Sequence, residues 1–592
     1  METSITESTL QSLPTISRGF QDLVRLIPQA KVTGGGVMAL AGQGNRFNAF
    51  FIDGANNNDI QGIAANGTNG GQTGAPPVSV EAIEEIQVLL APYDVQFGNF
   101  TGGSINAITR SGSNENKASA WYYFRNENLA GRATQPVETP GNPGVFSRPR
   151  LPAFYNQTFG IWNSGALVRN KVFYFALIEK QSESRPRPFN MSEYRGNSTQ
   201  QQLFALSDSI KNKYNYDPGS FLEGIDELTT TRVNLKIDWN ASIKDKFMLS
   251  YRYNYTERIS QGVAGATLVF FQNIGFTVPA RTHAASFEWK RFLKKEMNNR
   301  LLLTFTNQLD NRKWMGQLFP RVSIADGSGF ITFGSEANSG VSAFKANDIT
   351  LFDAFKIITN QHVFTIGLDV NYSKFDNRSI PNYYGNYQFR NLNDFLNGAF
   401  PIRFQRSFLT TEEPNSKHAD LGVKFSTLRS SSFINDEIRL SAKLKLNWGL
   451  RLDIHSMPAK PKKDAFFNDT AISIISRYYD LEGASSGEAM RPQWAFSPRL
   501  GVDYKLTRYG INIRGGAGIF VGHIVNVWTY NVYNNGIGSI DINPQQLGLK
   551  FIADPYDQPT PQSLNIDPSN LKGELNIMAK RFKYPSVFRS TI

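Results

Sequence analysis

Cysteine is absent from the chain of 592 residues. Its absence excludes thiol nucleophiles, thiolate zinc sites, iron–sulfur clusters and disulfide bonds. In so long a chain it also suits a protein that crosses an oxidising compartment before it folds. The length exceeds what one compact soluble core can use, so we expect several domains or one very large barrel.

Long apolar runs are missing as well. No stretch approaches the ~18–20 apolar residues that a membrane-spanning helix needs, which excludes a helical membrane protein. The first residues, Met1 to Ser8, contain neither a basic segment nor an apolar one, so they predict no signal peptide. The chain is therefore either cytoplasmic or without its true N-terminus.

Residue patterns that carry chemistry are also scarce. The five histidines are too dispersed for a metal motif. Gly483 to Gly487 matches the G-x-S-x-G pattern, but it lies in a long polar stretch without the strand and helix that a nucleophile elbow requires. Gly98, Gly102 and Gly103 open no helix, so bends between strands explain them better than a phosphate cradle. We expect no enzyme, no metal site and no cofactor.

The charge balance is basic, with a net charge of +12 from 62 basic and 50 acidic residues. The basic residues are scattered along the chain and form no cluster, which argues against nucleic acid as a partner. A solvated channel wall or an anionic membrane surface explains the excess better.

Alternation of apolar and polar residues is the strongest pattern that is present. From Ala442 to His455 every even position is apolar and every odd position is polar or glycine. This alternation is the period of a β-strand. The run of fourteen residues exceeds the ~5–6 residues of a common soluble strand and reaches the ~9–11 that cross an outer membrane.

The connections between the predicted strands alternate in length. Thirteen strands are predicted near 118–127, 156–168, 172–184, 230–240, 245–257, 282–293, 298–312, 347–358, 361–375, 421–440, 442–456, 495–507 and 510–521. Tight turns are predicted at 169–171, 241–244, 294–297, 359–360, 441 and 508–509, and long polar loops in between. Short turns on one side and long loops on the other indicate an antiparallel up-and-down membrane barrel. Its lumen is too wide for side chains to fill, so the N-terminal region must plug it.

The N-terminal region carries the motifs Phe51-Ile-Asp-Gly54, Ile83 to Gly98, and Gly102-Gly-Ser-Ile-Asn-Ala-Ile-Thr109, with Asn45 to Asn48, Asn56 to Asp59, Asn66 to Gly74, and Arg110 to Gly112 beside them. These motifs resemble the plug domain of TonB-dependent outer-membrane receptors, and in particular the Oar-like, SusC-related branch. Tyr122 to Gly131, Phe496 to Gly501, and Arg514 to Phe520 resemble barrel strands of the same family.

The resemblance implies a mainly β fold, with a small mixed α/β plug in residues 1–113 and the N-terminal part of a barrel in 114–592. We expect about 13 of the 22 strands of a large plugged transporter, hence a fragment with both ends missing. The plug motif implies structural roles for Asp53, Gly54, Pro92, Tyr93, Gly98, Gly102, Gly103, Asn106 and Thr109.

Two sets of residues are candidates for contact with a ligand or with the membrane interface. Asn56, Asn57, Asn58 and Asp59 either face a ligand or a cation at the plug apex, or form a turn that exploits their tolerance of left-handed backbone. Strand aromatics would form interface belts, and loop aromatics could touch ligand. The belt candidates are Trp121, Tyr122, Tyr123, Phe173, Tyr174 and Trp448, and the loop candidates are Tyr383, Tyr384 and Tyr387.

The resemblance also implies a function, which is TonB-energised import of a nutrient across the bacterial outer membrane. The partners would be outer-membrane lipid, the TonB–ExbB–ExbD complex through a segment absent from this chain, an extracellular ligand (peptide, glycan or chelate) and a surface lipoprotein lid. The alternative is a surface barrel that binds extracellular partners in adhesion, without transport. A third reading, a soluble multi-domain β-protein, predicts a monomer in buffer without detergent.

Overall fold

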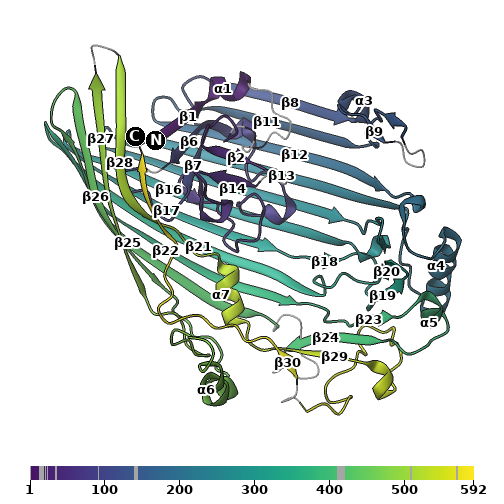
Figure 1. Ribbon diagram of the computed structural model, residues 1–592. Helices are drawn as coiled ribbons and strands as arrows, with labels where there is room; N and C mark the ends of the chain where they lie inside the picture. Colours follow the sequence, from purple (N-terminus) through teal and green to yellow (C-terminus); the bar gives the residue numbers. More distant parts are fainter. Residues whose placement is uncertain are drawn as a thin grey trace.

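The computed structural model of the chain describes residues 2–12, 19, 22, 24–33, 37–90, 92–138, 144–409, 421–506, 510–567 and 571–591 (Figure 1). Strands dominate, and they form one small sheet, one very large sheet, a third sheet at the end where the long connections lie, and two two-stranded pairs. None of the helices in these ranges has both the length and the apolar character to cross a membrane.

The N-terminal part is a five-stranded sheet in the order β1-β6-β7-β4-β5. Its strands are β1 (Glu2–Thr6), β4 (Ala49–Ile52), β5 (Ala55–Asn56), β6 (Ile83–Leu90) and β7 (Gly103–Thr109), accompanied by α1 (Glu7–Ser12) and the pair β2 (Ala30–Val32) and β3 (Met38–Leu40). The apolar residues of β6 and β7 are buried between this sheet and its neighbours, as Ile86, Val88 and Ile105 show. This is the predicted small mixed α/β unit, and it lies against one face of the large sheet (Figure 1).

The large sheet is antiparallel, and each long strand pairs with its neighbours along the chain. Its strands are β8 (Lys117–Asn126), β11 (Tyr155–Val168), β12 (Val172–Pro188), β13 (Glu223–Asn240), β14 (Asp245–Ser260), β16 (Phe276–Lys294), β17 (Met297–Asp310), β21 (Val341–Ile358), β22 (His362–Ile380), β25 (Val423–Arg439), β26 (Leu444–Ser456), β27 (Gln493–Leu506), β28 (Ile511–Val521) and β31 (Ser586–Thr591), with β18 (Lys313–Trp314) beside β16. All thirteen predicted strands are present, which confirms the up-and-down architecture. Within the described ranges the sheet stays open, with β8 and β31 as its edges.

The alternation of short and long connections is present as predicted. The turns at 241–244 and 295–296, for example, join β13 to β14 and β16 to β17. The predicted turn at 508–509 lies outside the described residues. The division into domains at residue 113 remains a prediction, and the small sheet ends at Thr109 whereas the large one begins at Lys117.

The polarity of the large sheet is that of a membrane barrel. On β26, Trp448 and Leu450 are about two-fifths exposed, whereas Arg451 and Asp453 are buried on the opposite face. Successive residues of a strand point to opposite faces, so one face is apolar and bare while the other is polar and covered. The polar face is the one that contacts the N-terminal unit.

The long connections are not plain polar loops, and here the sequence-based expectation was incomplete. They contribute a seven-stranded sheet made of β15 (Leu268–Phe270), β20 (Gly329–Phe333), β19 (Arg321–Asp326), β23 (Asn386–Phe389), β24 (Arg403–Leu409), β29 (Ile537–Ile542) and β30 (Lys572–Gly573). With α4 (Gln200–Tyr214) and α5 (Leu392–Leu396), which share its apolar core, this sheet forms what we call the outer cap. Its strands have two to seven residues, too short for a period of two to be recognised among polar neighbours.

The remaining elements are short. They are α3 (Glu127–Ala130), β9 (Val137–Glu138), β10 (Phe146–Ser147), α6 (Ile472–Ile475), which follows a π-helical turn (Phe467–Ala471), α7 (Asn526–Tyr533), and 3-10 turns at Asn45–Phe47, Gly71–Thr73, Val80–Ala82, Met191–Glu193, Gln272–Ile274 and Pro544–Leu547.

Several aromatic residues occupy other places than predicted. Trp121 is buried in the apolar cluster shared with the N-terminal unit, so it belongs to no interface belt, whereas Tyr122 on the opposite face is well exposed. Tyr387 is fully buried in the outer cap, where its hydroxyl donates to Gln558, and Tyr384 is buried nearby. These rings pack the outer cap and present no surface to a ligand.

Candidate functional site

Basic side chains of the large sheet hold the N-terminal unit, which we call the plug, by donating to its backbone carbonyls. Arg232 donates to the carbonyl of Pro76 at 3.1 Å, and Lys236 to that of Thr109 at 2.9 Å. Such bonds are directional and individually modest, worth about 0.5–1.5 kcal/mol net, or more with a charged donor. The plug is thus positioned by many separable polar contacts.

The grip is densest on the plug loop 92–99. Nη1 of Arg499 donates to the carbonyls of Pro92, Asp94 and Phe97 at 3.0, 3.0 and 2.7 Å. Arg451 reaches the same loop, with Nη1 at 3.5 Å from the carbonyl of Val95. One segment of plug backbone is therefore clasped by two guanidinium groups.

The charge of Arg451 is balanced within the barrel wall. Its Nη2 lies 2.8 Å from Asp369 and its Nε 2.9 Å from Asp453. Arg429 forms a two-pronged pair with Asp369 at 2.7 and 2.9 Å. The two arginines and two aspartates form a closed network, which offsets the cost of burying the charges.

Gly98 lets this network approach the plug. A side chain there would begin 2.6 Å from Nε of Arg451, so only glycine leaves room for the guanidinium. Gly102 and Gly103 are also places without room for a side chain. Asn48 crowds the first, and Leu90 would lie 2.7 Å from a Cβ at the second. None of the three has a positive φ, so what they share is close packing. Gly102 also lies in a bend just before β7, as the sequence suggested.

Pro92 and Tyr93 open the same loop. Pro92 is buried and supplies one of the carbonyls held by Arg499. The ring of Tyr93 lies flat on two glycines that pair across neighbouring strands, since Cβ atoms on Gly501 and Gly516 would come within 2.6 and 2.5 Å of it. Its hydroxyl meets Thr591.

Asp53, Gly54 and Thr109 form the turn at the other end of the plug sheet. Asp53 has φ +50° and accepts from the backbone N–H and the hydroxyl of Thr109 at 2.9 and 2.7 Å. Gly54 follows at φ +78°, where a side chain would meet Leu302 of the barrel wall at 2.6 Å. The turn thus closes the plug sheet and fits it to the wall.

The four apex residues, Asn56 to Asp59, do not share one role. The side chain of Asn56 accepts from the backbone N–H of Asn58 at 2.9 Å. The side chain of Asn58 in turn accepts from the backbone N–H of Phe50 at 2.5 Å. Asp59 caps its own loop by accepting from Gln61 at 3.1 Å. None of the four has a positive φ, so the turn relies on side-chain acceptors. Asn56 and Asn58 line the cavity described next, whereas Asn57 lines a separate one.

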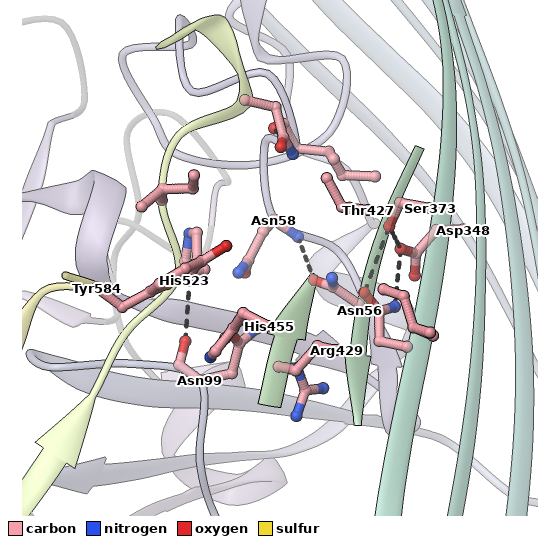
Figure 2. A pocket seen from close by; sticks show the side chains of 15 residues that line it. Asn56, Asn58, Asn99, Asp348, Ser373, Thr427, Arg429, His455, His523 and Tyr584 are labelled. Atoms are coloured by element: carbon pink, nitrogen blue, oxygen red, sulfur yellow. Dashed lines mark hydrogen bonds between the residues drawn. The ribbon is translucent and has the colours of Figure 1, made fainter. Parts of the chain in front are cut away.

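A cavity of about 70 Å³, the outer pocket, lies between the apex and the wall (Figure 2). Plug, barrel strands and the connection between β28 and β31 all contribute side chains to it. Its lining is Asn56, Asn58, Ile60, Asn99, Asp348, Asn371, Ser373, Thr427, Leu428, Arg429, His455, His523, Ile524, Asn526 and Tyr584. Figure 2 shows the ring of Tyr584 against His455, with ring centres 3.8 Å apart.

Residues 522–533, which include α7, cross the plug apex and form what we call the strap. His523 Nδ1 lies 3.0 Å from the carbonyl of Asn99, and Asn526 donates to the carbonyl of Ile60 at 2.9 Å. The backbone N–H of Val527 donates to Gln61 at 3.0 Å. Burial lowers the pKa of His523 below its ordinary value, so the ring is neutral at neutral pH.

A second cavity of about 140 Å³, the seam, continues along the plug–wall boundary and shares Asn56, Asn99, Asn371 and Arg429 with the outer pocket. Apolar side chains such as Phe51, Phe97 and Leu302 also line it, together with Asn106 of the plug motif. The two cavities mark a continuous, loosely filled boundary beside the plug. In the described part of the chain, no group of three or more His, Asp or Glu side chains could hold a metal ion.

Sequence reasoning missed most of the wall side of this site. Arg451, Asp453 and His455 occupy odd positions of the alternating run 442–455, so their polar side chains were predicted to face the lumen. Which of them meet each other or the plug depends on strand register, which a single sequence does not reveal. The charged residues on the lumen face of each strand were the signal that could have found them.

The chain belongs to a family of outer-membrane β-barrel proteins. The model of that family, described as an outer membrane beta barrel domain, matches residues 197–588. The chain is thus a protein of the bacterial outer membrane.

One relative is a TonB-dependent transporter, and the similar solved structures are outer-membrane proteins. Over 160 residues the chain is 31% identical to the TonB-dependent transporter Oar of Myxococcus xanthus, a stretch that covers 27% of this chain and 14% of the relative. The fold is similar to that of the outer membrane transporter YddB from Escherichia coli, with a TM-score of 0.59 and 14% identity over 91% of this chain and 63% of that one. It is also similar to a ferric enterobactin receptor mutant from Pseudomonas aeruginosa, with a TM-score of 0.53 and 15% identity over 90% and 63%. These findings confirm the predicted resemblance, and the chain spans less than two thirds of the length of each relative.

Proposed function

We propose that the chain belongs to an importer that takes up an extracellular ligand through the outer membrane, with the plug closing the lumen at rest. Energy would come from the TonB–ExbB–ExbD complex, acting on the N-terminal side of the plug. The residues of the plug motif would keep the resting plug in register with the wall. The outer pocket would receive part of the ligand, which makes Asn56 and Asn58 our candidates for ligand contact at the apex.

One observation carries this proposal, which is the way the plug is seated. Plug and wall share an apolar cluster at Trp121, Phe175 and Leu177. Along the loop 92–99 and at Thr109, however, Arg499, Arg451 and Lys236 hold the plug through hydrogen bonds to backbone carbonyls, beside two cavities. Hydrogen bonds in a wet lumen exchange with water at low net cost, so the plug can leave and return.

A disulfide lock in the full-length receptor tests the proposal. Val95 of the plug and Gly449 of β26 suit it, because a Cβ on Gly449 would lie 2.7 Å from a methyl group of Val95. The chain has no cysteine, so Val95→Cys with Gly449→Cys provides the only thiols in it. We expect oxidised cells to stop growing on nutrients whose uptake requires the receptor, and reductant to restore growth.

The single substitutions Val95→Cys and Gly449→Cys are the controls, and both should grow under oxidising conditions. Undiminished uptake by the locked receptor, with the cross-link verified by mass spectrometry, would show that the plug does not move and that the import proposal is wrong.

A second candidate, surface adhesion, is favoured by one patch. In the connection between β26 and β27, Phe466, Tyr478 and Tyr479 are each more than two-thirds exposed, and exposed aromatic groups of this kind mark contact surfaces. Adhesion needs no plug movement, so the locked receptor should keep it. Tyr478→Ser with Tyr479→Ser should remove attachment if the patch is adhesive.

A further inference from the structure

The short turns of the large sheet carry basic side chains that look scattered in the sequence but gather at one edge. Up-and-down pairing brings these turns to the edge of the sheet that lies opposite the outer cap (Figure 1). Four of the turns hold exposed basic side chains that form no ion pair with the part of the chain that the structure describes. They are Arg169, Lys171, Lys244, Lys294, Lys295 and Lys443.

Acidic side chains do not balance this charge. Glu296 is the only acidic residue in the four turns, which comprise residues 169–171, 241–244, 294–296 and 440–443. Three acidic side chains at neighbouring strand ends are already paired with other basic residues, at distances between 2.8 and 3.8 Å. These pairs are Asp245–Arg291, Glu437–Lys445 and Asp503–Arg514. The edge therefore keeps an excess of positive charge.

Each of these turns also exposes an apolar side chain beside the basic one. Ile243 precedes Lys244 and is 92% exposed, and Leu167 next to the first turn is 62% exposed. Leu293 and Leu440 occupy similar places at the other two turns, with 41% and 56% of their surface exposed. A single exposed apolar residue needs no explanation, but the same pairing at four turns along one edge indicates a surface that does not face bulk water.

A ladder of aromatic rings lies beside these turns on the lipid face. Trp239, Phe247 and Trp289 pair across β13, β14 and β16, and their ring centres are 5.2 and 5.9 Å apart. Aromatic belts of this kind mark the level of the lipid head groups. Lys244 precedes Phe247 by about 10 Å of strand, so its flexible side chain reaches the same level.

We propose that the short turns are immersed in the head-group layer of the inner leaflet and bind acidic phospholipid there. Short turns of outer-membrane barrels face the periplasm, which places them at this leaflet. The basic side chains would donate to phosphate oxygens, and the apolar side chains beside them would lie against acyl chains. An acidic protein segment in water would leave Ile243 bare. The inference rests on the place of the barrel in the membrane and is independent of import.

The depth of Ile243 tests the immersion. The chain has no cysteine, so Ile243→Cys gives it a single thiol for a nitroxide label. In the full-length receptor, placed in vesicles of phosphatidylcholine and phosphatidylglycerol, the label should be more accessible to oxygen than to a water-soluble nickel chelate. Ser476→Cys, in the exposed connection between β26 and β27, is the control and should show the opposite preference.

The charge is tested on two neighbouring turns, which adjoin where the backbone N–H of Phe292 donates to the carbonyl of Lys244 at 2.7 Å. Lys244→Gln, Lys294→Gln and Lys295→Gln are combined in the full-length receptor, and native mass spectrometry in detergent follows the binding of phosphatidylglycerol and phosphatidylcholine. Each basic residue near an acidic lipid surface strengthens binding about fivefold. The triple variant should therefore retain fewer phosphatidylglycerol molecules, with an affinity at these turns about a hundredfold lower. Its binding of phosphatidylcholine should not change.

Two controls make the charge experiment specific. Arginine in place of lysine at the same three positions preserves the charge and should preserve lipid binding. Lys460→Gln, Lys462→Gln and Lys463→Gln remove three exposed lysines from the connection between β26 and β27, at the opposite end of the barrel, and should leave phosphatidylglycerol binding unchanged. Heat-modifiable gel mobility verifies that each variant is folded.

Three results would each overturn the assignment. One is equal retention of both lipids by the unaltered receptor, a comparison that needs no variant. Another is the same loss of phosphatidylglycerol in both triple variants. The third is a label at position 243 that the nickel chelate reaches more readily than oxygen does, because the turns would then lie in water. Import is tested separately by the disulfide lock, which does not depend on the lipid.

Discussion

At the scale of single residues, the plug is fitted to the wall by positions where nothing larger than hydrogen is tolerated. Gly98 is the sharpest case, since Arg451 occupies the place of its side chain. The sequence showed this glycine within a motif but not the guanidinium beside it, which comes from a strand some 350 residues later. A contact so distant along the chain cannot be inferred from local pattern.

Gly98→Ala should loosen the plug by about 1–3 kcal/mol, because the added methyl group displaces Arg451 from its paired position. Urea denaturation of the receptor, monitored by protease cleavage within the plug, measures the loss. Gly44→Ala is the control, since no atom lies within 4 Å of a Cβ there. Equal stability of both variants would mean that Arg451 can move aside at no cost.

His523 predicts a pH dependence of the strap. Its pKa is lowered by burial when the strap is docked, and it returns to about 6.5 when the strap is free. The free strap therefore binds the proton more readily, and docking is fully stable above about pH 6.5 and weakens as the pH falls below that value.

Hydrogen exchange of the backbone in residues 526–533 should accordingly accelerate at mildly acidic pH. His523→Gln retains a donor for the carbonyl of Asn99 and should remove most of the acceleration. The same pH profile in both proteins would place the titrating group elsewhere.

At the scale of elements, prediction succeeded where strands are long and failed where they are short. The alternating run 442–455 predicted β26 to within two residues at its start, because the lipid face and the lumen impose opposite polarity on neighbouring positions. The strands of the outer cap obey no such rule. Tyr387 belongs to a small globular core that happens to be assembled from several connections, and its sequence neighbourhood looks like any polar loop.

Tyr387→Ala should destabilise the outer cap by about 3–5 kcal/mol, the cost of a large cavity in a packed core. Hydrogen exchange should increase in β19, β23 and β24 and remain unchanged in the plug. Tyr479→Ala, at an exposed position, is the control. An increase that extends to the plug would show that cap and plug unfold as one unit.

At the scale of the whole molecule, the chain is polar inside and apolar outside. Leu450→Arg would put a charge on the lipid face, which should cost about 2–4 kcal/mol if the residue lies near the middle of the membrane. Heat-modifiable mobility of receptor assembled in vesicles measures the loss of folded protein. Ser476→Arg, in an exposed connection, should assemble normally. Normal assembly of Leu450→Arg would place this face in contact with protein or water.

The seating of Tyr93 has a mechanical consequence. The ring lies on bare main chain at Gly501 and Gly516. Nη1 of Arg499 holds the carbonyls of Pro92, Asp94 and Phe97 from a single point, and Nη1 of Arg451 holds Gln96. A pull on one end of this loop would load these bonds together, so the loop would resist up to a threshold force and then release in one step.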